Sequence, residues 1–208
     1  MACGEISVCG GIPARLFRIS FSGELAYEIA VSAAYGDSLV RAIMAAGSEF
    51  AITPYGLEAL NVLRIEKGHL TGNELTGQVT AADVGLGKMV SPKKDCIGKA
   101  MSQRPALIEP DRMVLAGFRP VDPNAVLTAG AHFIGLGKPA VTANDEGWMT
   151  SVCHSPLLGH SIGLGFIRNG PQRHGERVRA VDQVRGTDIE VEIVSPHFHD
   201  PLGERLRA

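Results

Sequence analysis

Two charged side chains, Glu28 and Arg64, occur in sequence contexts in which a charged group is expected to bind a specific partner. Glu28 lies in the alternating run 26–31 (AYEIAV), between Ala26 and Ala30. A carboxylate flanked by alanines leaves room for a planar ligand against the strand. Carboxylates recognise an N–H/NH₂ edge through two parallel charge-assisted hydrogen bonds, and a pterin or a guanidinium offers that geometry. A solvent-facing or salt-bridged glutamate is the alternative.

Arg64 falls between Leu57 and Leu60 on a helical wheel of the segment 54–67. The other apolar residues around that wheel are Ala59, Val62, Leu63 and Ile65. A helix that is apolar nearly all round is expected to be largely buried. A buried guanidinium must find an anion, and both a protein carboxylate and a ligand carboxylate remain open as that anion.

Other chemical patterns are weaker. His197 and His199 form a possible metal pair without a third ligand at a suggestive spacing, so we expect no metal site. The GLGK pieces at 85–88 and 135–138 lack the length of a phosphate-binding loop and are expected to be turns. The cysteines are scattered without a CxxC pair and are expected to be free thiols: Cys3, Cys9, Cys96 and Cys153.

The elements that must position Glu28 and Arg64 follow from periodicity. Residues 14–22 and 26–31 alternate and predict a hairpin, with Tyr27, Ile29 and Val31 on the core face. The following segments predict helices at 36–47, 54–67, 81–89 and near 97–104.

Capping residues support the two longer helices. Asp37 is the expected N-cap and Gly47 the C-terminal end of the helix 36–47. For the helix 54–67, Thr53 is the expected cap, Pro54 suits the first turn, and Gly68 is a natural left-handed stop.

Composition changes at 104–112 (RPALIEPDR), which predicts a linker. Six strand-like runs follow between turn residues, at 113–118, 138–143, 147–154, 161–167, 176–181 and 187–194. Such spacing suggests a small antiparallel barrel or sandwich. We therefore expect an α+β module at 1–104 and a β module at 112–208.

Bulk properties exclude several classes. The 208 residues carry a formal net charge of -2, so the chain has no net positive charge to attract nucleic acid or an anionic membrane. No run approaches the roughly 20 apolar residues of a membrane helix, and the first residues lack the pattern of a signal peptide. A cytoplasmic protein is expected. The chain could be a small protein or a fragment of a longer one.

Several motifs occur in the order typical of one superfamily. GELAYE (23–28) matches a turn and strand of the glycine-cleavage T-protein superfamily, LRIEKG (63–68) its helix-end motif, and KKDCIGK (93–99) its K-x-D-F-I-G-K segment. GWMTSVCHSPLLGHSIGLGFI (147–167) resembles its C-terminal barrel. The resemblance covers nearly the whole chain and implies a partial T-protein-like folate-binding α+β domain followed by a small antiparallel β-barrel.

Within that superfamily, the segment 66–86 and the ending SPHFHDPLGERLR resemble alpha subunits of heterotetrameric sarcosine oxidases. Aminomethyltransferases are the alternative enzyme, and a non-catalytic folate-binding or interaction module is the non-enzymatic one. His69 stands where the iron–sulfur repair branch carries cysteine, which argues against that branch.

The resemblance implies that tetrahydrofolate is held with its pterin edge paired to Glu28, with Arg64 near the site and Phe21 and Tyr27 lining it. Phe21 replaces the usual tyrosine.

In the whole enzyme, the resemblance implies that a flavin in another subunit would oxidise sarcosine and that folate would capture the released carbon. Flavin and NAD sites would lie in segments or partner subunits outside this chain. No residue is assigned as a catalytic acid or base, and the chain alone is expected to be inactive and to need other oxidase subunits or self-association.

Overall fold

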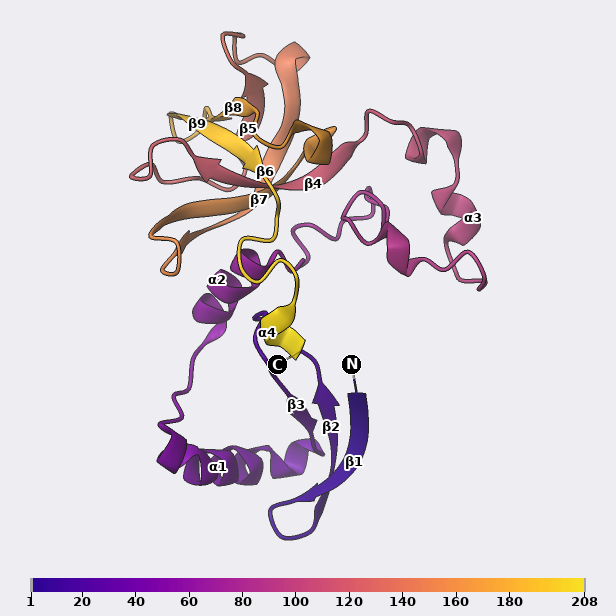
Figure 1. The fold of residues 1–208 in the computed structure, drawn as a ribbon, viewed down its shortest axis with the longest axis vertical. Helices are drawn as coiled ribbons and strands as arrows, with labels where there is room; N and C mark the ends of the chain where they lie inside the picture. The colour runs from indigo at the N-terminus through magenta and orange to yellow at the C-terminus, as the bar shows by residue number, and fades with distance from the viewer. Residues whose placement is uncertain (1, 208) are drawn as a thin grey trace. The chain divides into compact units, whose positions relative to one another are not determined.

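The computed structural model describes residues 2–207. These form two compact units, residues 2–63 with 200–207, and residues 64–199 (Figure 1). The strands are β1 (Ala2–Val8), β2 (Ile12–Arg18), β3 (Glu28–Ala30), β4 (Met113–Pro120), β5 (His132–Gly135), β6 (Asp145–Ser155), β7 (His160–Arg168), β8 (Arg177–Asp182) and β9 (Thr187–Val194). The α-helices are α1 (Gly36–Gly47), α2 (Leu57–Lys67), α3 (Lys99–Ser102) and α4 (Glu204–Arg207).

The first unit contains a three-stranded antiparallel sheet in the order β1-β2-β3. The predicted hairpin is confirmed, because β2 pairs with β3 and places Phe17 opposite Glu28. The strand predicted at 14–22 ends earlier, at Arg18, and bends occupy 21–25. β1 was not predicted. It pairs with the whole of β2 and leaves β3 as the opposite edge of the sheet.

The helix α1 has the predicted bounds but not the predicted cap. Tyr35 is the N-cap and its side chain makes no capping bond, while Asp37 pairs with Arg41 one turn later at 2.8 Å. Among the described residues of the first unit, Ala14 and Leu39 are its buried apolar side chains. The prediction that Tyr27 faces a core was therefore wrong, since Tyr27 is 54% exposed.

The helix α2 begins at Leu57, three residues later than predicted, and the Thr53 hydroxyl donates to the Ala51 carbonyl instead of capping it. Burial is confined to the last turn, Arg64–Lys67, and Leu57 is 83% exposed, so the expectation of a largely buried helix was wrong. The predicted stop is confirmed because Gly68 has φ +78°.

The helix end carries the hydrogen bonds of a Schellman motif. The Gly68 N–H donates to the Ile65 carbonyl at 3.0 Å, and the His69 N–H to the Arg64 carbonyl at 2.8 Å. After it, the helix predicted at 81–89 is replaced by turns at 81–85 and a 3₁₀ helix at Gly87–Met89, whereas α3 lies within the predicted segment 97–104.

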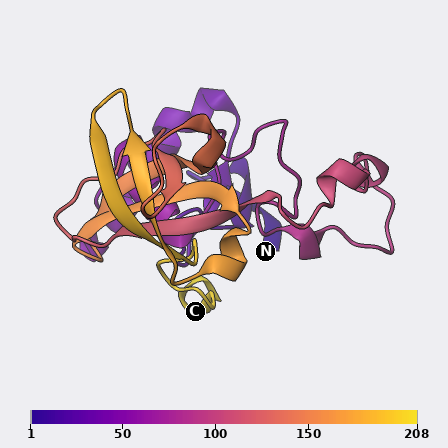
Figure 2. The ribbon, with the colours of Figure 1, turned by 90° about the horizontal axis from the view of Figure 1, so that it is seen from above.

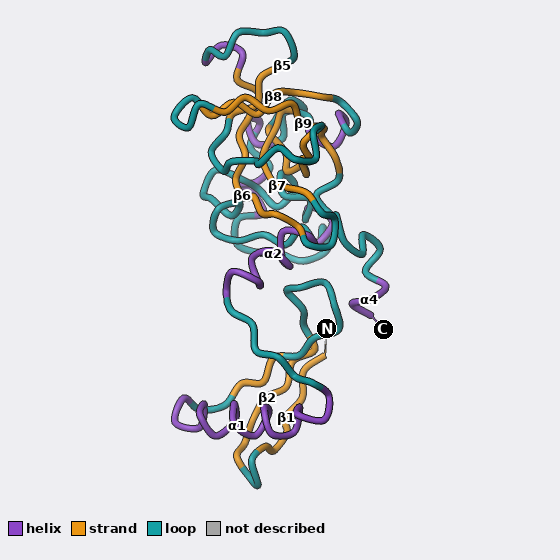
Figure 3. Tube along the Cα trace, turned by 90° about the vertical axis from the view of Figure 1, so that its left-hand side faces the viewer, coloured by secondary structure: helices purple, strands orange, loops and turns teal. Residues whose placement is uncertain are grey.

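In the second unit, the strands close into an antiparallel barrel in the order β4-β7-β6-β5-β8-β9, so the fold is a barrel and not a sandwich (Figures 2 and 3). The predicted strand at 138–143 was wrong: that segment is a loop that leads into a 3₁₀ helix at Thr142–Asn144, and the strand is β5, just before it. In the barrel interior, the rings of Phe118 and Phe133 stack with centroids 4.0 Å apart.

The α+β architecture followed by a small barrel is confirmed. Residues 64–104 belong to the same compact unit as the barrel, while the module boundary at 104–112 stays a prediction about the sequence. Within residues 2–207, no helix is both long and apolar enough to cross a membrane.

Candidate functional site

Arg64 lies in the last turn of α2, and its guanidinium is 2% exposed. Its partner is Glu74, which is fully buried ten residues later, and the Arg64 Nη1 atom lies 3.1 Å from Glu74 Oε2. Nη2 donates to the Ser151 hydroxyl at 2.7 Å, and Nη1 also donates to the His69 carbonyl at 3.2 Å. Of the two anions left open by the sequence, the structure contains the protein carboxylate.

Glu74 collects donors from three segments. Its Oε2 accepts from the Thr71 N–H at 2.9 Å and the Thr71 hydroxyl at 3.1 Å. Its Oε1 accepts from the hydroxyls of Thr150 and Ser151 on β6, each at 2.6 Å. No described buried side-chain nitrogen or oxygen atom lacks a partner, so the charge is compensated as burial requires.

These contacts set the ionisation of Glu74. Burial alone would raise its pKa, but the hydrogen bonds from Ser151, Thr150 and Thr71, with the charge of Arg64, outweigh burial and hold the pKa of Glu74 below its ordinary value. The carboxylate is therefore the ionised anchor of the network.

A pH titration of stability tests this assignment. Because the folded-state pKa of Glu74 is depressed, its contribution to stability is fully present above the ordinary glutamate pKa of 4.5 and is lost as the pH falls through the lower folded value. Urea denaturation between pH 7 and pH 3, followed by the fluorescence of Trp148, should show stability falling below about pH 5. In Glu74→Gln the acid-dependent loss should be smaller; an equally steep loss would mean that other groups control it.

A second set of contacts fixes the end of α2. Glu66 Oε1 accepts from the Ser155 hydroxyl at 2.5 Å, and the Glu66 carbonyl accepts from the His199 N–H at 2.8 Å. The His197 Nδ1 atom lies 3.0 Å from the Lys67 carbonyl oxygen. His197 and His199, considered above as a possible metal pair, here satisfy carbonyl groups at a helix end.

A repeated local pattern could have revealed these anchors from the sequence. Thr71-x-x-Glu74 is followed by Thr80-x-x-Asp83, and in both the threonine N–H and hydroxyl donate to the acid three residues later. Asp83 then holds Arg112, whose Nε lies 2.9 Å from Asp83 Oδ1. Both acids are buried, so the pattern marks carboxylates that tie the segment 71–83 to the barrel.

The other predicted ligand residues lie in the first unit. Glu28 is exposed on the edge strand β3, with Ala30 also exposed beside it. Phe21 is exposed in the bend after β2, where the Gly23 N–H donates to the Ser20 hydroxyl at 3.1 Å. Because Glu28 is exposed, a planar molecule can reach its carboxylate.

Glu28, Tyr27 and Phe21 belong to the first unit, where all three are exposed. Arg64 belongs to the second unit, where it is committed to Glu74. The four predicted residues therefore differ in environment: Glu28, Tyr27 and Phe21 are exposed, and Arg64 is buried in an ion pair with Glu74.

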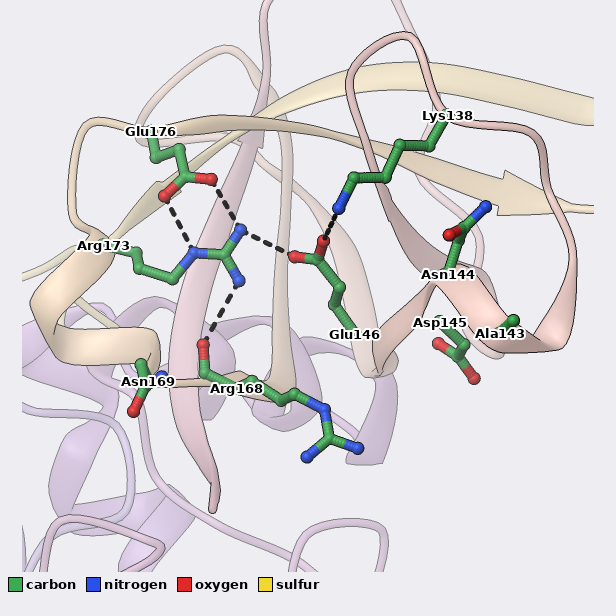
Figure 4. A pocket seen from close by; sticks show the side chains of 9 residues that line it. All are labelled: Lys138, Ala143, Asn144, Asp145, Glu146, Arg168, Asn169, Arg173 and Glu176. Atoms are coloured by element: carbon green, nitrogen blue, oxygen red, sulfur yellow. Dashed lines mark hydrogen bonds and ion pairs between the residues drawn. The ribbon is translucent and has the colours of Figure 1, made fainter. Parts of the chain in front are cut away.

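The barrel carries a polar pocket of about 450 Å³ (Figure 4). Arg173 lies within it and donates to both oxygens of Glu176, at 2.8 and 2.6 Å, and pairs with Glu146 at 2.7 Å. Hydrogen bonding to Glu176 and Glu146 raises the pKa of Arg173. These charges satisfy one another, so the pocket stabilises the barrel and offers no unmatched charge to a ligand.

The four cysteines are free thiols in the structure. Cys153, on β6, is half-buried, and burial together with the charge of Glu66 raises its pKa to about 12. A thiol with that pKa is protonated at neutral pH and unreactive.

Comparison with known proteins places this geometry in a family. A model of the GCVT N-terminal domain matches residues 1–94, and a model of the glycine cleavage T-protein C-terminal barrel domain matches residues 114–200. The crystal structure of the glycine cleavage system aminomethyltransferase T from Bartonella henselae matches 90% of this chain and 50% of that chain, with a TM-score of 0.76 and 22% identity. That similarity concerns the fold.

Similar sequences carry two names. The sarcosine oxidase subunit alpha of Rhizobium meliloti is 49% identical over 99% of this chain, which spans 21% of that protein. The aminomethyltransferase of Streptomyces avermitilis is 32% identical over 91% of this chain, which spans 50% of that protein. With both domain models matched in order and the barrel closed as they require, the chain belongs to the glycine cleavage T-protein family.

Proposed function

We propose that this chain is the folate-binding portion of a sarcosine oxidase-like enzyme that acts on an N-methyl amine. The similarity to a sarcosine oxidase subunit alpha over 99% of the chain carries the proposal. The whole enzyme would need other subunits, and this chain alone would be inactive. Its cytoplasmic location stays a prediction.

The residues around β3 fit a pterin. Glu28 supplies an exposed carboxylate on an edge strand, where it can accept two hydrogen bonds from an N–H/NH₂ edge. Tyr27 and Phe21 are exposed aromatic side chains of the same unit that can pack against a planar ring. Tetrahydrofolate, when bound, supplies the N5 and N10 atoms that accept a one-carbon unit as methylene-tetrahydrofolate.

Under this proposal the chain orients the folate and assigns no residue to acid–base chemistry. Arg64 makes no direct contact with folate in this proposal, because its guanidinium holds Glu74 and the segment 69–74 in the second unit. Direct contacts come from Glu28, Tyr27 and Phe21.

Calorimetric titration of the 208-residue chain with reduced folate tests the proposal. Binding in the micromolar range is expected, and Glu28→Ala should weaken it at least tenfold, since each lost charge-assisted hydrogen bond costs about 1.5–3 kcal/mol. Glu49→Ala removes an exposed carboxylate of the same unit and should leave the affinity unchanged. Absence of binding to the folded chain, or equal binding by Glu28→Ala, would contradict the proposal.

An aminomethyltransferase role is the second candidate, supported by identities of 30–32% to several aminomethyltransferases over at least 90% of this chain. The two roles differ in their requirements. An aminomethyltransferase depends on a lipoyl carrier protein, whereas a sarcosine oxidase depends on flavin-bearing partners. Methylene-tetrahydrofolate formation from sarcosine without a lipoyl carrier would favour the oxidase.

A further inference from the structure

The segment 87–104, which we call the basic arm, differs in charge from the rest of the chain. It contains five basic side chains and one acidic one, Asp95, although the whole chain has a net charge of -2. The basic residues are Lys88, Lys93, Lys94, Lys99 and Arg104. Charge of one sign is thus concentrated on a short stretch of a chain that is otherwise net acidic.

The basic arm also exposes apolar side chains. Ile97 is fully exposed, and Met89 and Met101 are 72% and 51% exposed. Figures 1 and 2 both show the arm, which carries α3, extending away from the barrel strands. Large exposed apolar side chains grouped among charges are typical of an interaction surface.

A groove runs along this arm. Its cavity of about 670 Å³ is lined by apolar side chains that include Ile97, Met101 and Val79, and by the charged residues Asp83, Glu109 and Arg112. A concave, mainly apolar site of this size accommodates protruding side chains, which a flat bilayer surface does not present.

The arm is held in shape by its own contacts. The Lys99 ammonium donates to the carbonyls of Pro92 and Lys94, at 2.9 and 2.7 Å, and closes the loop between them. Lys99 is therefore engaged within the arm, and Lys88, Lys93 and Lys94 are exposed on the arm, close in sequence to residues that line the groove.

We propose that the basic arm and its groove are the docking surface for a protein partner that presents apolar side chains bordered by carboxylates. Charge complementarity favours this partner: its apolar side chains contact Ile97 and Met101 at the groove, and its carboxylates meet the exposed lysines of the arm. The inference rests on the arm alone and is independent of the folate site, so either can fail without the other.

Fluorescence anisotropy with the full chain tests the inference. The probe is a labelled helical peptide whose leucine face is bordered by glutamates; a second peptide has lysines in place of the glutamates. The chain should bind the first peptide, more weakly as salt rises, and bind the second at least tenfold more weakly.

Variants locate the site. Ile97→Asp should weaken binding of the glutamate-bordered peptide about tenfold, and Lys93→Glu about fivefold. Val184→Asp changes a similarly exposed apolar side chain on the barrel, and Arg15→Glu makes the same charge reversal in the first unit. Both controls should bind as the wild type does.

Three outcomes would overturn the proposal. The first is no binding, or binding that Val184→Asp and Ile97→Asp weaken equally. The second is sedimentation of the chain as a dimer that Ile97→Asp dissociates, which would make a second copy the occupant. The third is tighter binding to phosphatidylserine vesicles than to the peptide, which would make a lipid surface the occupant.

Discussion

Replacing Glu74 by alanine is expected to lower the free energy of unfolding of the barrel unit by about 3–5 kcal/mol, because removing one member of a buried ion pair leaves the other charge uncompensated. Arg64 would keep its position in the last turn of α2 but lose its carboxylate partner, and the Ser151 hydroxyl would lose its acceptor, while the Thr150 hydroxyl would keep only the Leu164 carbonyl. Urea denaturation followed by the fluorescence of Trp148, the single tryptophan, measures the change.

An exposed ion pair of the same charge type supplies the control. Asp37 and Arg41 pair on the surface of α1 with side chains 77% and 78% exposed. Asp37→Ala should change stability by less than about 0.5 kcal/mol. A loss in Glu74→Ala no larger than this would show that the buried network does not hold the segment 69–74 to β6.

Gly68→Ala has the second large expected effect. Gly68 has φ +78°, which an alanine adopts at a cost of roughly 1–2 kcal/mol. A Cβ atom there would also overlap the Pro196 carbonyl and the His197 ring. Moving that segment disturbs the contact between His197 and the Lys67 carbonyl, so the total loss should reach roughly 2–4 kcal/mol.

Gly85→Ala separates the two causes. Gly85 also has φ +78°, but a Cβ atom there meets nothing within 4 Å. Gly85→Ala should therefore lower the free energy of unfolding only by the cost of the left-handed backbone conformation, about 1–2 kcal/mol. Equal losses in Gly68→Ala and Gly85→Ala, measured by the same urea denaturation, would remove the close approach to Pro196 from the explanation.

Local patterns predicted the elements with strong signals of their own. Alternation predicted the hairpin of β2 and β3, and a left-handed glycine predicted the end of α2 at Gly68. Five of the six strand runs after 112 correspond to barrel strands. The exception, 138–143, contains Pro139 and forms the loop between β5 and β6, where Pro139 and Ala140 accept hydrogen bonds from Asn144 and Gln183.

Other elements depend on contacts distant in sequence. β1 contains Cys3, Gly4 and Ser7, which give little strand signal, and it is extended because it pairs along the full length of β2. The helix α2 was predicted too long because Thr53 and Pro54 suit a helix start. The chain instead has no regular secondary structure from Ile52 to Gly56.

The burial of Arg64 is confirmed, although the largely buried helix from which it was predicted is not: only the last turn of α2, Arg64–Lys67, is buried. The partner of Arg64 was not predictable. The choice of Glu74 depends on Ser151, 87 residues after Arg64, whose hydroxyl contacts both members of the pair. Such a contact becomes visible only when β6 is placed against the end of α2.

The closure of the barrel has a consequence for aggregation. Every strand from β4 to β9 has two hydrogen-bonded neighbours, so the barrel presents no free strand edge among the described residues. The three-stranded sheet has two edge strands, β1 and β3. The seven residues of β1 include no proline and no lysine, which are residues that commonly protect a strand edge. Intermolecular β-sheet growth in this protein would therefore start at β1 or β3, and a lysine introduced into β1 would be the direct way to suppress it.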